Sequence, residues 1–176
     1  EWSPYHGAAY AVIEATARLV AAGANWSKAR FSYQEYFERM DKQAERFGQP
    51  VAALLGSIEA QIQLGLPSIG GKDSMSGTFE ELTVPPTLVA FGVTTADSRN
   101  VLSPEFKAVG ENIYYIPGQA LSEEIDFDLI KSNFAQFEAL QKAYKVTAAS
   151  AVKYGGVLES LALATFGNHI GAEVTL

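Results

Sequence analysis

The chain has 176 residues, of which 48% are hydrophobic and 19% are charged, and its formal net charge is -7. This composition supplies enough apolar material for the core of one ordinary domain or of parts of two. The negative charge disfavours a nucleic-acid-binding surface, because phosphate backbones recruit Lys and Arg, whereas a small phosphorylated ligand needs only local positive charge. The absence of cysteine excludes disulfides, thiolate metal sites and a cysteine nucleophile on this chain.

The first half of the chain is predicted to be rich in helix. Apolar periodicity and helix-end signals predict helices over 8–22, 33–47 and 50–64. The second of these rests on Ser32 and Glu35, which are spaced as a Ser-x-x-Glu capping box. Pro50 suits the first position of the third helix, whose apolar stripe comprises Val51, Leu54, Leu55, Ile58 and Ile62. The β-prone run 87–94 then predicts a strand with buried character.

The second half alternates between predicted strands and helices. A polar, proline-containing segment at 97–110 indicates a domain boundary, which we place after Val101. Strands are predicted over 112–116, over 146–152 and from Ile170, with helices over 127–144 and 157–166. This alternation favours a layered α/β or α+β module with helices on one face of a sheet. No apolar run reaches the roughly 18 residues that a membrane-spanning helix requires.

A glycine-rich run over 67–78 reads Pro-Ser-Ile-Gly-Gly-Lys-Asp-Ser-Met-Ser-Gly-Thr. Consecutive N–H groups in such a segment can form an anion-binding concavity, and Lys72 adds a point charge. The hydroxyls of the run add donors, and Asp73 could hold a metal ion or a ribose hydroxyl. The spacing matches neither the Walker A nor the Rossmann pattern. The residues alone are equally consistent with a polar turn between a helix and a strand.

The segment 64–76, which contains Gly-Gly-Lys-Asp-Ser-Met-Ser, resembles the signature of phosphoribosylformylglycinamidine synthases. Supporting segments lie at 84–88, 154–157 and 164–171, in the order expected for the second of the two aminoimidazole-ribonucleotide-synthetase-like halves of that family. The resemblance implies an α/β (α+β) fold. Residues 1–101 would be the tail of an N-terminal-type subdomain, and residues 102–176 the start of a C-terminal-type βαβαβ subdomain with helices on a mixed sheet.

The resemblance also implies a reaction. Enzymes of this family use ATP, with Mg²⁺, to activate the formamide oxygen of formylglycinamide ribonucleotide, and ammonia from glutamine then gives the amidine. The glutaminase domain uses a cysteine nucleophile, so this chain would belong to the synthetase part and would be inactive alone. The implied location is cytoplasmic, the substrate is a small ribonucleotide, and neither nucleic acid nor a membrane is an expected partner. Two alternatives stay open, namely another ATP-dependent enzyme of the same superfamily and a catalytically silent half that serves as a scaffold.

The implied functional residues gather in the glycine-rich run. Lys72 and Asp73 are the expected catalytic residues, with Lys72 offsetting phosphate charge and Asp73 organising Lys72 or a bound ion. The expected contacts to substrate or nucleotide are Gly70, Gly71, Ser74 and Ser76.

Two further positions carry weaker expectations. Related synthetases have a metal-binding Glu where this chain has Glu14, but they carry Asn four residues later, where Arg18 stands here. Glu14 and Arg18 could instead form an ion pair at helical spacing. Gly155 and Gly156 could present N–H groups to an anion at a helix N-terminus, or they could be a tight packing point. Some relatives carry acidic residues just before this pair, whereas this chain has the uncharged or basic run 151–154.

Overall fold

The computed structural model describes residues 3–119 and 124–174 and divides into two compact units. The first unit contains the residues up to Thr16 together with Trp26–Thr95, and the second contains Ala17–Asn25 and the residues from Ala96 onward. Helix α1 (Pro4–Ala21) therefore contributes to both units. Within the described ranges, no helix is long and apolar enough to cross a membrane.

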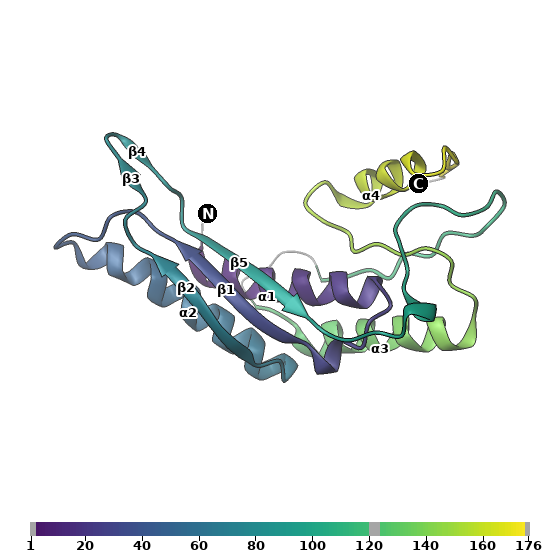
Figure 1. The fold of residues 1–176 in the computed structure, drawn as a ribbon, viewed down its shortest axis with the longest axis horizontal. Helices are drawn as coiled ribbons and strands as arrows, with labels where there is room; N and C mark the ends of the chain where they lie inside the picture. The colour runs from purple at the N-terminus through teal and green to yellow at the C-terminus, as the bar shows by residue number, and fades with distance from the viewer. Residues whose placement is uncertain (1–2, 120–123, 175–176) are drawn as a thin grey trace. The chain divides into compact units, whose positions relative to one another are not determined.

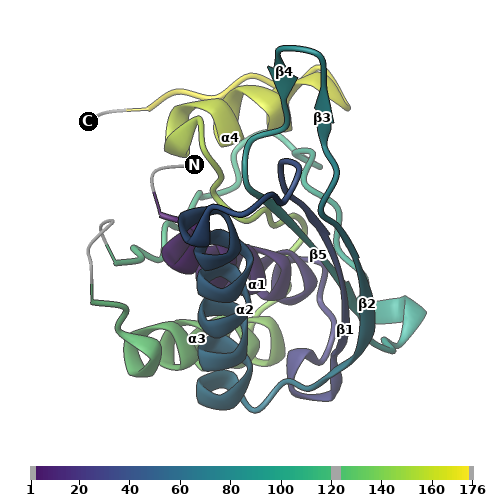
Figure 2. The same ribbon diagram turned by 90° about the vertical axis from the view of Figure 1, so that its left-hand side faces the viewer.

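The first unit is built on a three-stranded mixed sheet in the order β2-β1-β5. The strands are β1 (Arg30–Tyr36), β2 (Ser68–Ser74) and β5 (Thr87–Val93). Strand β1 pairs with β2 in parallel and with β5 antiparallel. Helices α1 and α2 (Ala44–Leu64) lie on the same face of this sheet (Figures 1 and 2). A short hairpin of β3 (Thr78–Phe79) and β4 (Leu82–Thr83) connects β2 to β5, and a 3-10 turn, η1 (Trp26–Lys28), precedes β1.

The core of the first unit follows from the alternation along β1. Every second residue is buried, from Phe31 through Tyr33 and Glu35 to Phe37, which follows the strand. This period of two places one row of side chains on a single face of the sheet. Phe37 packs with Ala8 and Ala53 from the two helices. The strand thus presents three aromatic side chains and Glu35 to the helices, and a mostly polar row to the other face.

The predicted helix over 33–47 is wrong, because its first residues form strand β1. The Ser-x-x-Glu spacing at Ser32 and Glu35 occurs here within a strand, where the two side chains lie on opposite faces. Helix α2 instead begins at Ala44 and carries Pro50 inside it. The glycine-rich run also differs from the polar turn considered above, because its first part is strand β2.

Helix α2 buries its small residues rather than its apolar stripe. The stripe predicted from the sequence is exposed, with Ile62 73% and Val51 54% accessible. The buried residues of α2 are Pro50, Ala53, Gly56, Ser57, Ala60 and Leu64. A Cβ at Gly56 would lie 1.9 Å from the carbonyl oxygen of Tyr5, so α1 and α2 approach too closely there for any larger residue.

The second unit contains helices α3 (Phe127–Ala143) and α4 (Gly156–Phe166) and a 3-10 turn, η2 (Ser98–Asn100). Both helices confirm the sequence predictions. The Asp126 carboxylate caps α3 by accepting a hydrogen bond from the Leu129 N–H at 2.8 Å. Helix α3 buries Phe127, Ile130 and Phe134.

No strand occurs within 96–119 or 124–174. The strands predicted over 112–116, over 146–152 and from Ile170 are therefore wrong, and the predicted βαβαβ arrangement is not found in these ranges. A strand requires a ladder of successive backbone bonds to a neighbour. The segment 146–152 makes no such ladder: the Val146 N–H donates to the nearby Tyr144 carbonyl at 3.0 Å, and the Ala149 N–H donates to the Ser103 carbonyl at 3.3 Å.

Candidate functional site

The glycine-rich run forms strand β2 and the segment that follows it. Along the parallel ladder, Gly71 lies opposite Tyr33, and the register shifts just before Gly70. Gly70 has a φ of 155°, which side-chain-bearing residues rarely adopt. A Cβ at Gly71 would lie 2.7 Å from the carbonyl oxygen of Tyr33. Strand pairing thus explains why glycine occurs at both positions, without any contribution from a ligand.

Lys72 and Asp73 are adjacent in sequence, but they lie on opposite faces of the sheet. The Lys72 Nζ lies 5.7 Å from the ring centroid of Tyr36, on the face turned away from α1 and α2. Asp73 lies opposite Glu35 and shares a hydrogen bond with it on the helix-covered face. Strand alternation therefore separates the two predicted catalytic side chains. Lys72 is available to a ligand at the open face, whereas Asp73 is engaged with Glu35.

Glu35 is the residue of this site that the sequence prediction missed. It is only 6% exposed and lies between Leu88 on β5 and Asp73 on β2. Burial, the hydrogen bond to Asp73 and the charge of Asp73 together raise the pKa of Glu35 to about 7. Its Oε1 is buried without a hydrogen-bond partner, as is the hydroxyl of Tyr33 on the same face. The period-two alternation from Phe31 to Phe37 was the signal that could have identified it as buried.

Backbone hydrogen bonds hold the end of β2 and the segment that follows it against the end of β1; we call these bonds the backbone brace and the segment 74–77 the braced segment. The Phe37 N–H donates to the Ser74 carbonyl at 2.8 Å, and the Gly77 N–H donates back to the Phe37 carbonyl at 2.9 Å. The Met40 N–H donates to the Met75 carbonyl at 3.2 Å. Ser74 is half-buried and Ser76 is exposed. The segment is therefore fixed against the end of β1 and leaves Ser76 accessible.

The N-terminus of α4 already has a partner within the chain. The Gly155 N–H donates to the Glu159 Oε2 at 3.0 Å, and the Gly156 N–H donates to the Lys153 carbonyl at 2.9 Å. An anion at this position would have to displace the Glu159 carboxylate. Binding of substrate or nucleotide by this glycine pair stays a prediction.

Glu14 lies half-buried on α1, and Arg18 is exposed one turn later. Among residues 3–119 and 124–174, no group of three or more His, Cys, Asp or Glu side chains is arranged to hold a metal ion. The role of Glu14 as a metal ligand stays a prediction.

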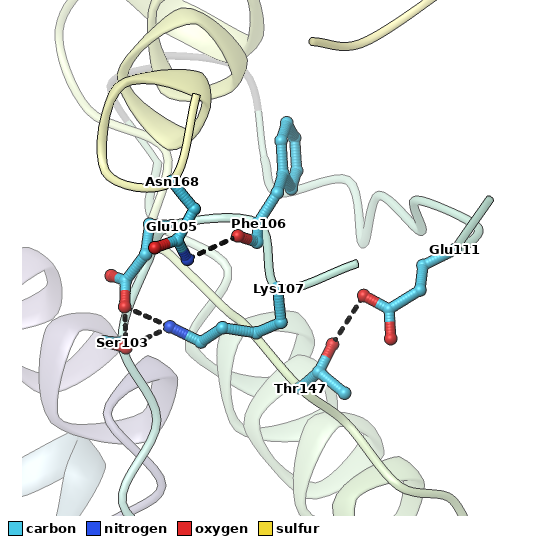
Figure 3. Close-up of polar contacts among 7 residues, drawn as sticks. All are labelled: Ser103, Glu105, Phe106, Lys107, Glu111, Thr147 and Asn168. Carbon is cyan, nitrogen blue, oxygen red and sulfur yellow. Dashed lines mark hydrogen bonds and ion pairs between the residues drawn. The ribbon is translucent and has the colours of Figure 1, made fainter. Parts of the chain in front are cut away.

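A polar cluster in the second unit surrounds Lys107 (Figure 3). Its ammonium donates to the Ser103 Oγ at 2.7 Å and pairs with the Glu105 carboxylate. The hydrogen bonds from Lys107 and Ser103 lower the pKa of Glu105 to about 2. The Asn168 side chain donates to the Phe106 carbonyl at 2.8 Å, which ties the same segment to the end of α4. Because Glu105 compensates the charge of Lys107, we interpret this cluster as a structural clamp.

Shallow hollows on the described part of the first unit include two whose lining does not contain residues 70–76. One has a volume of about 400 Å³ at the open face and the end of β5. Its lining includes Lys28, Arg30, Ile69 and Phe91. The other, of about 340 Å³, lies at the C-terminal end of α2.

Comparison with known proteins gives a fold. No protein-family model matches the chain, and no curated protein matches it. Among solved structures, T. maritima PurL complexed with ATP superimposes with a TM-score of 0.67 and 18% sequence identity. The chain has a PurL-like fold. The match covers 92% of this chain but 26% of the PurL chain, so the chain spans about a quarter of the length of that structure. The similarity supports the mixed α+β architecture, with helices packed on a mixed sheet.

Proposed function

We propose that this chain is part of the synthetase portion of a phosphoribosylformylglycinamidine synthase, an ATP-dependent amidoligase of purine biosynthesis. The observation that carries the proposal is the Gly-Gly-Lys-Asp-Ser-Met-Ser run, which begins on β2 and extends just past it, with Lys72 on the open face of the sheet, in a chain with a PurL-like fold. PurL is a phosphoribosylformylglycinamidine synthase, and its structure was solved with ATP. The fold similarity supports nucleotide chemistry without specifying the reaction.

In this proposal Lys72 and the hydroxyls of the braced segment act on a phosphate-bearing ligand. The Lys72 ammonium provides a compact charge at the open face, where it offsets phosphate charge. The exposed Ser76 hydroxyl and the half-buried Ser74 hydroxyl can orient phosphate oxygens. ATP, when bound, would transfer a phosphoryl group to the formamide oxygen, so that ammonia can attack the formamide carbon and the phosphorylated oxygen can leave as phosphate. The described residues contain no group of three or more His, Cys, Asp or Glu side chains that could hold a metal ion, and we assign no step through a metal to this chain.

The remaining assignments follow from the same proposal. The other domains of the synthase, including a glutaminase domain, would be the partners of this chain, and the location would be the cytoplasm. A second candidate is a catalytically silent half that serves as a scaffold. Its specific support is the N-terminus of α4, where Glu159 occupies the Gly155 N–H and 151–154 lacks acidic residues.

The test is a substitution of Lys72 in the full-length protein. We expect Lys72→Ala to reduce ammonia-dependent amidine formation by roughly 100-fold or more, the usual scale for losing an electrostatic contact to a developing charge. Glutamine hydrolysis should persist. Lys42→Ala, which removes an exposed lysine from the same unit, is the matched control and should leave the rate unchanged. Equal rates for Lys72→Ala and the control would reject the site and favour the scaffold.

A further inference from the structure

Glu35 and Asp73 form a carboxyl pair across the β1–β2 ladder. They are register partners in a parallel pair of strands, so their side chains lie on the same face. Only 6% of the accessible surface of Glu35 remains exposed, whereas Asp73 is exposed. On its other side Glu35 adjoins Leu88, which packs against the apolar cluster of Phe37. The Glu35 carboxyl therefore lies at the edge of the hydrophobic core, whereas the Asp73 carboxyl lies at the surface.

The charged groups on the surrounding elements do not compensate this pair. On α2, Arg46 pairs with Glu38 and Asp41, and Glu59 accepts a hydrogen bond from the Tyr5 hydroxyl. The other titratable groups of α1 and α2 are His6, which hydrogen-bonds Ser3, and Tyr10, Glu14, Glu45 and the exposed Arg18 in the last turn of α1. Burial and the neighbouring Asp73 raise the pKa of Glu35, and no cation lowers it. Two carboxylates this close cannot both be ionised without a large penalty.

We propose that Glu35 is a positioning residue for Asp73: as a neutral carboxylic acid it donates a hydrogen bond to the Asp73 carboxylate and fixes the end of strand β2. Below about pH 7 the pair carries one proton, and Glu35 is the more buried member, so the proton resides mainly on Glu35. Asp73 precedes Ser74, whose carbonyl is bonded to Phe37, so its orientation sets where the braced segment begins. Loss of the proton places two negative charges across the ladder and weakens the β1–β2 pairing at this point.

The first test reads the proton directly in the chain as it stands, by ¹³C NMR titration of the carboxyl groups. We expect one carboxyl with a midpoint near 7 in the wild type, and its loss in Glu35→Gln. In Asp73→Asn the midpoint should move down but stay above the ordinary value, because burial persists. Glu81→Gln, at an exposed glutamate, is the control and should retain the high midpoint.

Two results would overturn the proposal. The first is that every carboxyl titrates below about pH 5, the range of unperturbed Asp and Glu. The second is that millimolar Mg²⁺ shifts the Glu35 and Asp73 signals at pH 7, which would make the pair a cation site rather than a proton-sharing one.

The second test concerns ligand binding and rests on the proposed function. In the full-length protein, Glu35→Gln keeps the hydrogen-bond donor, so amidine formation at pH 6 should stay within about twofold of wild type. Its decline between pH 6 and 8 should be smaller than in the wild type. Glu35→Leu removes the donor and should lower the rate about tenfold. If Lys72→Ala abolishes activity while both Glu35 variants follow the wild-type pH profile, the positioning role is wrong. If Lys72→Ala has no effect, the proposed function fails, and the NMR titration still decides the carboxyl pair.

Discussion

Replacement of Glu35 by glutamine should increase the stability of this protein at alkaline pH, although it removes a charged side chain. The folded state raises the pKa of Glu35 from 4.5 to about 7, so it binds this proton more tightly than the unfolded chain does. The resulting stabilisation is fully present below about pH 4.5 and is lost as the pH rises through about 7. The glutamine side chain of the Glu35→Gln variant is neutral at every pH, so the variant does not suffer this loss.

The magnitude follows from the two pKa values. A tenfold change in proton affinity corresponds to about 1.4 kcal/mol, so the shift from 4.5 to about 7 amounts to about 3 kcal/mol over the full pH range. Between pH 5 and pH 8 the linkage relation leaves about 2.5 kcal/mol of this. Glu35 is almost fully buried, so solvent screening should reduce the effect little. The comparison with the glutamine variant cancels the titration of all other groups, which the two proteins share.

The assay is urea unfolding of wild type and Glu35→Gln at pH 5, 6, 7 and 8, with Glu81→Gln as the exposed control. The free energies of unfolding of wild type and Glu35→Gln should be similar at pH 5 and should differ by about 2.5 kcal/mol at pH 8, with the variant more stable. In Asp73→Asn the free energy of unfolding should fall less steeply with pH than in the wild type, because the contribution of Asp73 to the raised pKa of Glu35 is removed. The fall should not vanish, because burial, the largest cause of the raised pKa, remains. Parallel pH profiles for wild type and Glu35→Gln would refute the reasoning.

Three further changes probe other parts of the fold. Gly71→Ala should destabilise the chain by about 1–3 kcal/mol in urea unfolding, because its Cβ would lie 2.7 Å from the Tyr33 carbonyl oxygen; an unchanged midpoint would contradict the close β1–β2 approach. Asp126→Ala removes the N-cap of α3 and should cost about 1 kcal/mol, with Asp126→Asn nearly neutral, and both are measurable by circular dichroism on denaturation. Lys107→Met should raise the pKa of Glu105 from about 2 toward its ordinary value in a ¹³C titration, and a Glu105 midpoint that does not move would exclude the ion pair.

The sequence predicted those elements whose local signals were strong. Helix α3 was predicted because its sequence is a long amphipathic run, and strand β5 because β-branched and aromatic residues follow a Pro-Pro pair. Helix α1 has the same apolar periodicity as the prediction, although it begins earlier, at Pro4. In each case the local preference and the tertiary environment favour the same structure.

Strand β1 was missed because a local rule competed with a longer pattern. The Ser32 and Glu35 spacing satisfies a capping box, but the alternation from Phe31 to Phe37 is what pairing with β2 and β5 requires. That error hid Glu35, which as a helix-capping residue would be exposed. The apolar stripe of α2 gave a second wrong expectation, because an apolar stripe normally faces the core. Helix α1 packs so closely against α2 at Gly56 that the small residues of α2 are buried instead. Neither contact can be read from periodicity alone.

The structure changes which residues of the glycine-rich run should be tested for ligand binding. Gly70 adopts an unusual φ, the backbone of Gly71 lies too close to Tyr33 for a side chain, and Asp73 contacts the buried Glu35. The fold alone therefore explains why these three residue types occur at these positions. Substituting any of them perturbs folding together with any binding. Lys72 differs, because its stacking on the Tyr36 ring is worth only about 0.5–1 kcal/mol at an exposed position. A large loss of activity in Lys72→Ala with unchanged stability would therefore report on a ligand, whereas the same loss in Gly71→Ala would not.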